Sequence, residues 1–325
     1  CRSADLPLTV LDSTHPDQVR MVIASDLSKA VVVVSSKSGS TVETDSQRRV
    51  LIEAMTAIGV DPTSRLVVVT DPGSDLEQVA REEGYRAVFL ADSHVGGRYS
   101  ALTAFGLVPA ALAGADIELL LDQTTAVQSS WEADDNPALR LGAALGADRR
   151  DKICIDADTS HLVGFGDWAE QLIAESTGKD GRGLLPVVVT PDAPELQQGA
   201  DDVHHIRIGE PAPPFGTSVT GSLGAQLLAW EYAVAVSSRL LGVNPFDQPD
   251  VESAKTATRG LLNSFSRLDL RPIPLATADP ARLPDQGRSW GSYYDRHPQI
   301  MAGSILLGYV SRGTRRQRVR MATTA

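Results

Sequence analysis

The feature that most constrains this chain is a regular alternation of short β-branched runs with segments of helical periodicity. Residues 30–35 (AVVVVS) form a continuous apolar run, which predicts a strand buried on both faces and parallel to its neighbours. Residues 41–59 follow with apolar side chains at the 3.6-residue spacing of a helix. Ser40 and Glu43 give that helix a capping-box start. Such alternation predicts an α/β fold with helices covering a doubly wound parallel sheet.

The alternation occurs in two successive arrays, separated by a break at 134–137. Further strands are expected at 65–70, 86–90, 152–156, 185–190 and 203–208, and further helices at 74–84, 99–112, 117–131, 167–176, 218–241 and from Pro249. Two arrays predict two parallel-sheet sandwiches. The first covers residues 1–134 and is expected to be incomplete at its N-terminus, and the second covers 135–265. Residues 266–325 show no pattern to which we assign a fold.

The charge is distributed unevenly along the chain. The 325 residues carry a formal net charge of -11, which includes five arginines and no acid in residues 311–325. The first 310 residues therefore carry -16, and a body that acidic argues against a nucleic-acid-binding surface. The arginine tail is either an RNA-binding arm or, as we expect, a terminus without a binding role.

The cysteines and the hydropathy bear on the compartment. Two cysteines, Cys1 and Cys154, cannot build a disulfide framework and indicate a reducing compartment, so we expect a cytoplasmic protein. No apolar run approaches the ~18 residues of a membrane span, and we expect no membrane association. Because the chain begins at Cys1 rather than Met, we expect a fragment or a processed product.

The first segment that indicates chemistry is the turn SSKSGST at 35–41. It lies between a predicted buried strand and a helix N-terminus, where free backbone N–H groups and the positive end of the helix favour an anion. Its hydroxyl groups add neutral donors that suit phosphate oxygens. Ligands of doubly wound sheets bind beyond the carboxyl ends of the strands, where this turn is expected. We therefore predict a phosphate site rather than a merely capped polar turn.

Three other segments are weaker signals when taken singly. Paired glycines precede Arg98 in GGRYS (96–100), which allows a close approach of backbone to ligand, although a surface loop arginine is the alternative. Gln171 and Glu175 are four residues apart and share a helical face; a solvated surface glutamate is the alternative there. Gln248 and Lys255 are about two helical turns apart in NPFDQPDVESAK, so they face one pocket or belong to a capped surface helix.

Together these segments resemble a known family. SSKSGSTVET, GGRYS, QLIAESTGK and NPFDQPDVESAK occur in the order found in glucose-6-phosphate isomerases, and the resemblance covers roughly Leu8 to Lys255. The chain also resembles the actinobacterial branch of that family. The resemblance implies a pair of sugar isomerase (SIS) sandwiches in a homodimer, with active sites at the subunit interface, no metal and no organic cofactor.

The resemblance also implies roles for individual residues. The sugar phosphate would be bound by Ser36, Ser38 and Thr41 and by the backbone at Lys37. Arg98 would lie beside the reacting carbons, Glu175 would be the base, and Gln171 would border it. The residues Gln248 and Lys255 would line the site, with Lys255 near the ring oxygen.

Elementary chemistry supports these roles. Interconversion of an aldose and a ketose moves a proton between adjacent carbons through an enediolate, and one carboxylate can remove and return it. Such a base works best when a dry site raises its pKa towards neutrality. The enediolate needs a fixed cation, and an arginine stays charged at any working pH.

The chain departs from the family pattern at several positions. Nothing before Leu8 shows the family's upstream glycine-rich phosphate loop. The position of the family's ring-opening histidine holds Gln226, which cannot act as an acid, so ring opening is expected to depend on Lys255 or another group. Asp250 stands where the family has Gly or Ala. His204 and His205 belong to no motif, and we expect them to be packing or surface residues.

Three alternatives to a complete isomerase remain. The chain is the isomerase part of a transaldolase–isomerase fusion, a non-catalytic SIS module that senses sugar phosphates, or a truncated inactive chain. Because a sensor needs the serine turn but no base, the joint presence of Glu175 and Lys255 favours the enzyme.

Overall fold

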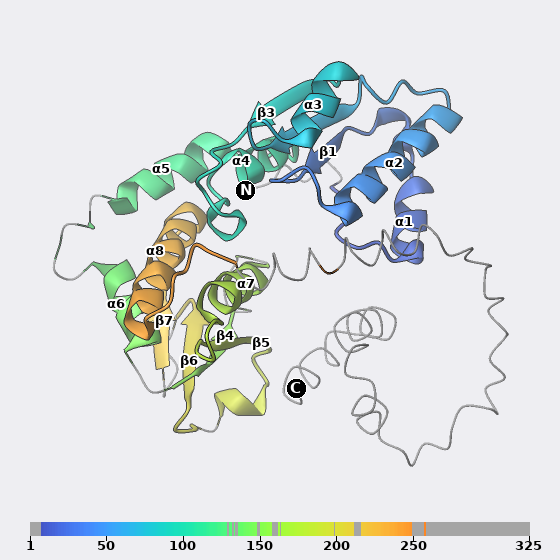
Figure 1. The fold of residues 1–325 in the computed structure, drawn as a ribbon. Helices are drawn as coiled ribbons and strands as arrows, with labels where there is room; N and C mark the ends of the chain where they lie inside the picture. Colours follow the sequence, from blue (N-terminus) through green and yellow to red (C-terminus); the bar gives the residue numbers. More distant parts are fainter. Residues whose placement is uncertain are drawn as a thin grey trace, which may run out of the picture. The chain divides into compact units, whose positions relative to one another are not determined.

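The computed structural model describes residues 8–128, 130–131, 133, 136–147, 150–157, 162, 164–197, 199–210, 216–248 and 257. Two compact units divide the chain, Cys1–Asp247 and Gln248–Ala325. The helices α1 to α8 and the strands β1 to β7 lie in the first unit (Figure 1). Both strand–helix arrays belong to the first unit, and the predicted domain boundaries at 134 and 265 stay predictions.

The first sheet has three parallel strands in the order β1-β2-β3. These are β1 (Val32–Ser35), β2 (Leu66–Thr70) and β3 (Ala87–Leu90), with Val34 opposite Val68 and Val68 opposite Val88. The strands alternate with α2 (Val42–Ala57) and α3 (Asp75–Glu82), and α1 (Pro16–Ile23) and the 3-10 turn η1 (Leu27–Lys29) precede them. The predicted parallel α/β array is therefore confirmed for this half.

One expectation about this sheet is wrong. Residues 30–35 were expected to form a strand buried on both faces, but β1 is an edge strand, in which Val32 and Val33 are half-buried, Val34 is buried and Ser35 is exposed. The central strand is β2, of which every residue is buried. A β-branched run alone does not distinguish an edge strand from a central one, because both favour the same side chains.

Three short elements connect the two sheets. The 3-10 turn η2 (Gly97–Tyr99) precedes α4 (Ala104–Leu112), and α5 (Ile117–Gln128) follows. The helix predicted to start at Tyr99 begins only after Thr103, whose hydroxyl accepts a hydrogen bond from the backbone N–H of Phe105. Neither α4 nor α5 has a buried residue.

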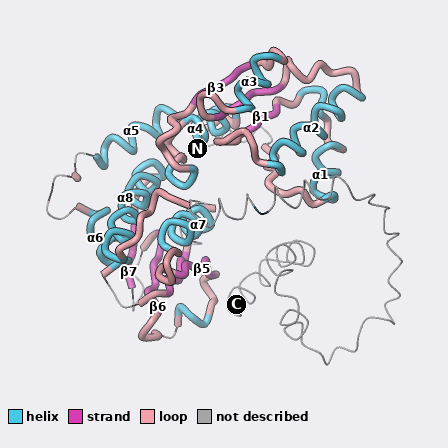
Figure 2. Tube along the Cα trace, in the orientation of Figure 1, coloured by secondary structure: helices cyan, strands magenta, loops and turns pink. Residues whose placement is uncertain are grey.

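The second sheet has four parallel strands in the order β5-β4-β6-β7. Figure 2 distinguishes the strands of the molecule, in magenta, from its helices, in cyan. The strands β4 (Lys152–Asp156), β5 (Leu185–Val189) and β6 (Val203–Ile208) lie where the sequence predicts them, and β7 (Gly216–Val219) was not predicted. The helices are α6 (Pro137–Gly146), α7 (Phe165–Thr177) and α8 (Leu223–Leu241), with the 3-10 turn η3 (Pro194–Leu196). Helix α6 was not predicted from the sequence, and the helix predicted at 218–241 begins within β7, five residues before the observed start of α8.

The main hydrophobic core lies around the second sheet. Ile153, Ile155, Leu172, Ile206 and Trp230 are at most 1% exposed and form one cluster. Helices α6 and α8 approach closely, because a Cβ on Gly142 would lie 2.6 Å from Cβ of Val236. No helix in the described ranges is long and apolar enough to cross a bilayer.

Candidate active site

The serine turn lies at the carboxyl end of β1 and is held by the neighbouring strand. The backbone N–H of Ser36 donates to the carbonyl of Val69 at 3.1 Å, and the Thr70 hydroxyl donates to the Ser36 carbonyl at 2.7 Å. The Ser36 hydroxyl lies 3.4 Å from Oγ1 of Thr41. Ser38 is exposed, and its hydroxyl accepts from the N–H and the hydroxyl of Ser40. The turn therefore presents hydroxyl groups on a fixed backbone.

Helix α2 begins one residue later than the predicted capping box requires. The N-cap is Thr41, not Ser40, and no side chain forms a capping hydrogen bond there, so the Ser40–Glu43 capping box is wrong. The first N–H groups of a helix have no partner within the helix itself. Because Thr41 leaves them uncapped, these groups are available to an anion, to which the helix dipole adds attraction.

Gly39 is required by the geometry of the turn. Its φ is +69°, a left-handed conformation that favours glycine, and a Cβ there would lie 2.7 Å from the backbone nitrogen of Leu76. The start of α3 therefore packs directly against the turn.

Lys37 connects three loops at the carboxyl edge of the first sheet. Its ammonium group contacts Oδ2 of Asp71, after β2, at 2.7 Å and the carbonyl of Ser93, after β3, at 3.0 Å. The side chain is thus engaged by these partners, and the proposed role of the Lys37 backbone in binding a phosphate stays a prediction. The same contacts hold the loop that leads to Arg98.

Arg98 is the buried centre of the site, with its side chain only 3% exposed. Its Nε donates to Oγ of Ser176 at 3.1 Å, and its Nη1 lies 3.4 Å from Oε2 of Glu175. Its Nη2 donates to the backbone carbonyls of Pro245 at 2.6 Å and Asp247 at 3.2 Å. One guanidinium therefore joins α7, η2 and the segment after α8.

Glu175 is held on both of its carboxylate oxygens. Gln171 donates to Oε1 at 3.0 Å, as expected for residues four apart on a helix, and Arg98 contacts Oε2. The Glu175 side chain is 40% exposed, so the described residues do not enclose it on every side. A fixed, partly exposed carboxylate beside a buried cation can receive a proton from a ligand.

Two residues that the sequence analysis did not single out complete this cluster. The Tyr99 hydroxyl donates to Oγ of Ser176 at 3.3 Å, and Ser176 is fully buried. Burial raises the pKa of Tyr99, so its hydroxyl stays protonated at neutral pH. Both lie inside the motifs GGRYS and QLIAESTGK, which is the signal that would have indicated them.

Gln226 has a packing environment. It is 2% exposed; its Nε2 donates to the carbonyl of Val219 at 3.1 Å, and its Oε1 accepts from Nε1 of Trp230 at 2.9 Å. The side chain thus connects β7 with the core face of α8. The histidines of β6 are likewise interior: His204 is 4% and His205 0% exposed, and burial lowers the pKa of His205.

The two remaining site residues lie in the second unit. Gln248 is half-buried and is the first residue of that unit. Lys255 and Asp250 lie outside the described residues, as does the helix predicted from Pro249.

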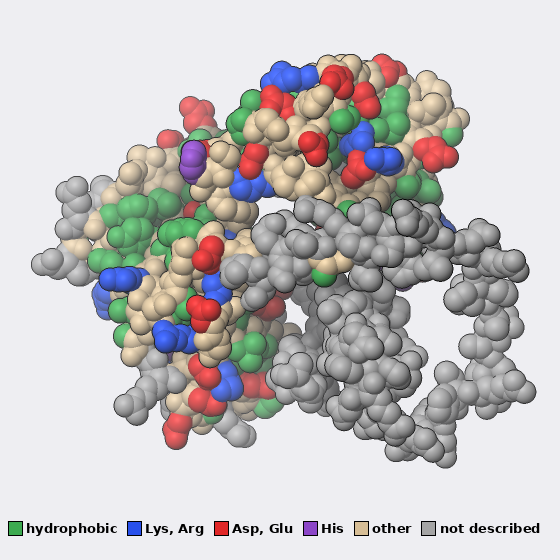
Figure 3. Space-filling model, in the orientation of Figure 1, with side chains coloured by type: hydrophobic (Ala, Val, Ile, Leu, Met, Phe, Trp, Pro, Cys, Tyr) green, Lys and Arg blue, Asp and Glu red, His purple; other side chains and the backbone are tan. Residues whose placement is uncertain are grey.

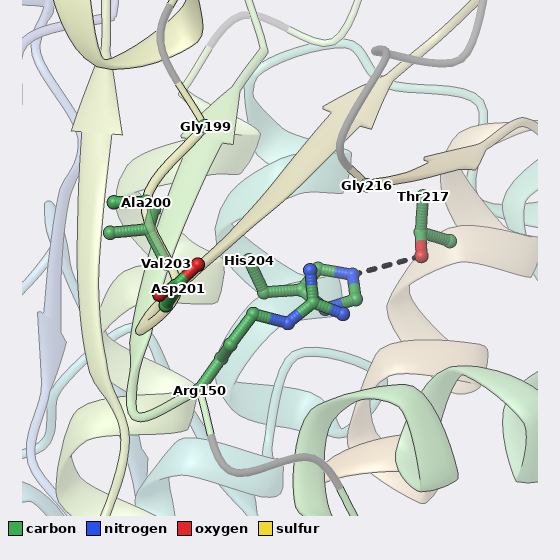
Figure 4. Close-up of a pocket in the computed structure, with 8 residues that line it drawn as sticks. All are labelled: Arg150, Gly199, Ala200, Asp201, Val203, His204, Gly216 and Thr217. Carbon is green, nitrogen blue, oxygen red and sulfur yellow. Dashed lines mark hydrogen bonds between the residues drawn. The ribbon is translucent and has the colours of Figure 1, made fainter.

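A cavity of about 510 Å³ lies elsewhere, beside the start of β6 and β7 (Figure 4). Its lining residues are Arg150, Gly199, Ala200, Asp201, Val203, His204, Gly216 and Thr217. Figure 4 shows the His204 ring directed at the Thr217 hydroxyl, with Nε2 at 2.9 Å from Oγ1. The cavity contains none of the predicted site residues. In the ranges described, no group of three or more His, Cys, Asp and Glu side chains is placed to hold a metal ion.

The relatives found by comparison with known proteins belong to one enzyme family. The chain is 31% identical to a probable glucose-6-phosphate isomerase of Haloquadratum walsbyi, over 78% of this chain and 72% of that protein. It is 30% identical to the glucose-6-phosphate isomerase of Synechococcus sp. (strain JA-3-3Ab), over 79% of this chain but only 61% of that protein's length. Relatives outside the actinobacteria thus carry the similarity, and the actinobacterial assignment stays a prediction.

Solved structures share the fold. A hypothetical protein of Thermus thermophilus superposes with a TM-score of 0.68 at 25% identity, covering 78% of this chain and 76% of that one. A glucose-6-phosphate isomerase of Chlamydia trachomatis gives a TM-score of 0.67 at 20% identity, covering 78% of this chain and 63% of that one. The expected α/β architecture with parallel sheets is therefore confirmed.

A separate similarity concerns the C-terminal region. Residues 251–309 match the family described as thermostable hemolysin, and the structure describes only Ala257 among them. That match covers a minor part of the chain, whereas the similarity to the isomerases extends over more than three quarters of it. The chain belongs to the glucose-6-phosphate isomerase family.

Proposed function

We propose that this protein interconverts glucose 6-phosphate and fructose 6-phosphate through an enediolate. The observation that carries the proposal is the Glu175 carboxylate, held between Gln171 and the buried guanidinium of Arg98 in a chain of this family. Because the chain spans only 61% of the length of its Synechococcus relative, the activity of that whole enzyme is a proposal for this chain.

Glu175 is the proposed base. A single carboxylate can take the proton from one carbon and return it to the next, which needs no group besides the base and an enediolate stabiliser. Gln171 and Arg98 fix both oxygens of Glu175, so the carboxylate is oriented before substrate binds. Arg98 supplies a permanent positive charge beside the place where the enediolate oxygens would carry negative charge.

The serine turn is the proposed phosphate site. Ser36, Ser38, Thr41 and the backbone at Lys37 would bind the phosphate together with the uncapped N-terminus of α2. Lys37, through Asp71 and Ser93, supports this by holding the turn and the Arg98 loop on the same sheet edge. Binding the phosphate at one end would leave the sugar carbons free to reach the base.

Ring opening is assigned to the segment after α8. Lys255 is the proposed donor near the ring oxygen, with Gln248 lining the site. The environment of Gln226 supports this choice, because its amide is engaged by Val219 and Trp230 and has no acidic proton.

The proposed active form is a cytoplasmic homodimer with sites at the subunit interface. Hydrophobic side chains gather over α5 and α8 on the face shown in Figure 3. Leu112 on α4 and Leu119 and Leu121 on α5 are 40–49% exposed, on helices without a buried residue. Exposed apolar helices of this kind favour a protein partner. A cytoplasmic location is supported by the buried Cys154, a free thiol whose pKa burial raises to about 11.

The direct test is conversion of substrate by the purified chain. Glucose 6-phosphate labelled with ¹³C should yield fructose 6-phosphate, and the reverse reaction should reach the same product ratio, both followed by NMR. Conversion should proceed equally with and without a metal chelator. A chain that binds either sugar phosphate, detected as a rise in melting temperature, but converts neither would contradict the proposed activity.

A further inference from the structure

We propose that Lys179 is a positioning residue: it anchors the segment 244–247, whose backbone carbonyls in turn hold Arg98 beside Glu175. The inference rests on the proposed function for the roles of Arg98 and Glu175. The anchoring itself rests on contacts within the first unit.

All three ammonium protons of Lys179 have partners in this segment. The ammonium donates to the backbone carbonyl of Asn244, to the carbonyl of Asp247 at 2.7 Å and to Oδ1 of Asp247 at 2.7 Å. The Lys179 side chain is 7% exposed, while that of Asp247 is 52% exposed. The lysine therefore points inward and binds the segment from its buried side.

Arg98 is a second cation that binds the segment 244–247. Nη2 of Arg98 donates to the carbonyls of Pro245 and Asp247, so the Asp247 carbonyl accepts from both Arg98 and Lys179. The Phe246 ring packs on Tyr99 with ring centroids 5.1 Å apart. The segment is thus fixed by η2 and by Lys179, which lies two residues after the end of α7, the helix that carries Glu175.

The turn that carries Lys179 is built to present it. Lys179 and Arg182 form an isolated β-bridge, and Asp180 between them has a φ of +55°. Arg182 donates to the carbonyl of Leu241 at 3.0 Å, at the C-terminus of α8. The turn is therefore docked against the end of α8, three residues before Asn244.

The energetics favour a positioning role over incidental pairing. A buried ammonium is costly unless it is paired and hydrogen-bonded. Here both cations donate to the carbonyls of one short segment, and Lys179 is also the main cause that lowers the pKa of Asp247. Because the Asp247 carbonyl accepts from both cations, the anchor holds an acceptor that orients Arg98.

The expected consequence is a loss of turnover rather than of phosphate binding. Misplacing a reacting group by about 1 Å can cost on the order of 10²-fold in rate. The phosphate is assigned to the serine turn, which the contacts of Lys179 with Asn244 and Asp247 do not involve, so KM should change less than kcat. This split distinguishes positioning from general destabilisation, which would lower the amount of active enzyme.

The test compares Lys179→Met with Lys152→Met in the full chain. Lys152 is a matched control, because it pairs with two carboxylates, Asp151 and Asp202, at the surface. Two measurements are made on each variant: amide hydrogen exchange of residues 246–248, and kcat and KM for glucose 6-phosphate. Asp247→Ala, at an exposed position, removes one of the three lysine contacts and serves as a milder variant that does not threaten folding.

For Lys179→Met we expect exchange at 246–248 to accelerate while β4 and β6 stay protected, with kcat falling about tenfold or more. Asp247→Ala should show the same changes to a smaller extent, and Lys152→Met none. Unchanged exchange in Lys179→Met and Asp247→Ala would overturn the anchor, and faster exchange with unchanged kcat would overturn its role in positioning. If the unsubstituted chain does not isomerise the sugar, the proposed function fails, and the exchange measurement alone decides the anchor.

Discussion

At the scale of single residues, the site places groups of opposite character a few ångströms apart. Glu175 and Arg98 meet at 3.4 Å with exposures of 40% and 3%, so a partly exposed carboxylate faces a buried cation. Exposed ion pairs contribute little to stability because water screens them. The value of this pair is therefore orientation of the base rather than stabilisation of the fold.

A different carboxyl, that of Glu231 on α8, has a strongly raised pKa. Burial raises its pKa from 4.5 to about 8, and its Oε1 has no hydrogen-bond partner in the part of the chain that the structure describes. It also contributes to the raised pKa of Tyr99, which places it near the cluster of Arg98 and Ser176.

Glu231 should make the stability depend on pH. The folded protein keeps this proton to a higher pH than the unfolded chain, so the free energy of unfolding should fall as pH rises from about 4.5 to about 8. Glu231→Gln has the same shape and no charge, and should be more stable than the parent at pH 8.5 by on the order of 2 kcal/mol, but similar at pH 5. Urea unfolding at both pH values measures the difference.

The control for this comparison is Glu53→Gln, an exposed position within α2. It should follow the parent at both pH values. If Glu231→Gln also follows the parent, the carboxyl is ionised in the folded state at pH 8.5 without cost, and the assignment is wrong.

At the scale of elements, sequence periodicity predicted most strands and helices. The exceptions are elements whose residues show no periodic pattern or show one that also fits a turn. Strands β4 and β6 were predicted to the residue, and most of their residues are buried. Strand β7 was missed because Gly216, Thr217 and Ser218 have no apolar alternation, and it forms only by pairing with β6. Tertiary pairing of this kind leaves no local signal.

Helix α6 was missed for another reason. Asn136 and Pro137 were interpreted as a break between domains, yet Asn136 caps the helix by accepting from the N–H groups of Ala138 and Leu139, and Pro137 is its first residue. Asparagine followed by proline is typical of turns and also of helix starts, so the same letters support both interpretations.

The serine turn gives a test at this scale. Gly39→Ala and Gly59→Ala both place a Cβ at positive φ, but only at Gly39 would the Cβ meet backbone, 2.7 Å from the nitrogen of Leu76. Gly59→Ala should cost about 1 kcal/mol of unfolding free energy, and Gly39→Ala at least twice that. Gly39→Ala should also weaken fructose 6-phosphate binding by calorimetry, since it displaces the turn. Equal costs and equal affinities would show that the turn does not depend on its contact with α3.

At the scale of the whole molecule, the candidate site is assembled from distant parts of the sequence. Arg98 contacts Glu175, 77 residues away, and the carbonyl of Asp247, 149 residues away. The motifs predicted the candidate site residues, but the sequence does not predict that Arg98 contacts both Glu175 and the segment after α8. Lys179 was not singled out, because a lysine in a glycine-containing loop is usually a surface charge.

The proposed homodimer gives a prediction at this scale. Leu119→Arg on α5 places a charge on a helix that has no buried residue of its own, and should convert the dimer to monomer. Met21→Arg on α1, where the side chain is 75% exposed, is the control and should leave the assembly unchanged. Sedimentation velocity separates the two species. An unsubstituted chain that sediments as a monomer at micromolar concentration would contradict the dimer.

The measurement that tests the central claim most directly is incorporation of solvent deuterium into fructose 6-phosphate by the full chain and by Glu175→Gln. The amide keeps the shape of the side chain, and its one oxygen can still accept from Arg98, while its NH2 group can donate to Gln171 once the Gln171 amide turns over; the basic oxygen is removed. General base catalysis contributes about 10²–10⁴-fold, so the variant should lose at least two orders of magnitude in exchange rate while its melting temperature and phosphate affinity stay unchanged. Deuterium incorporation at the parent rate in Glu175→Gln would show that Glu175 is not the base.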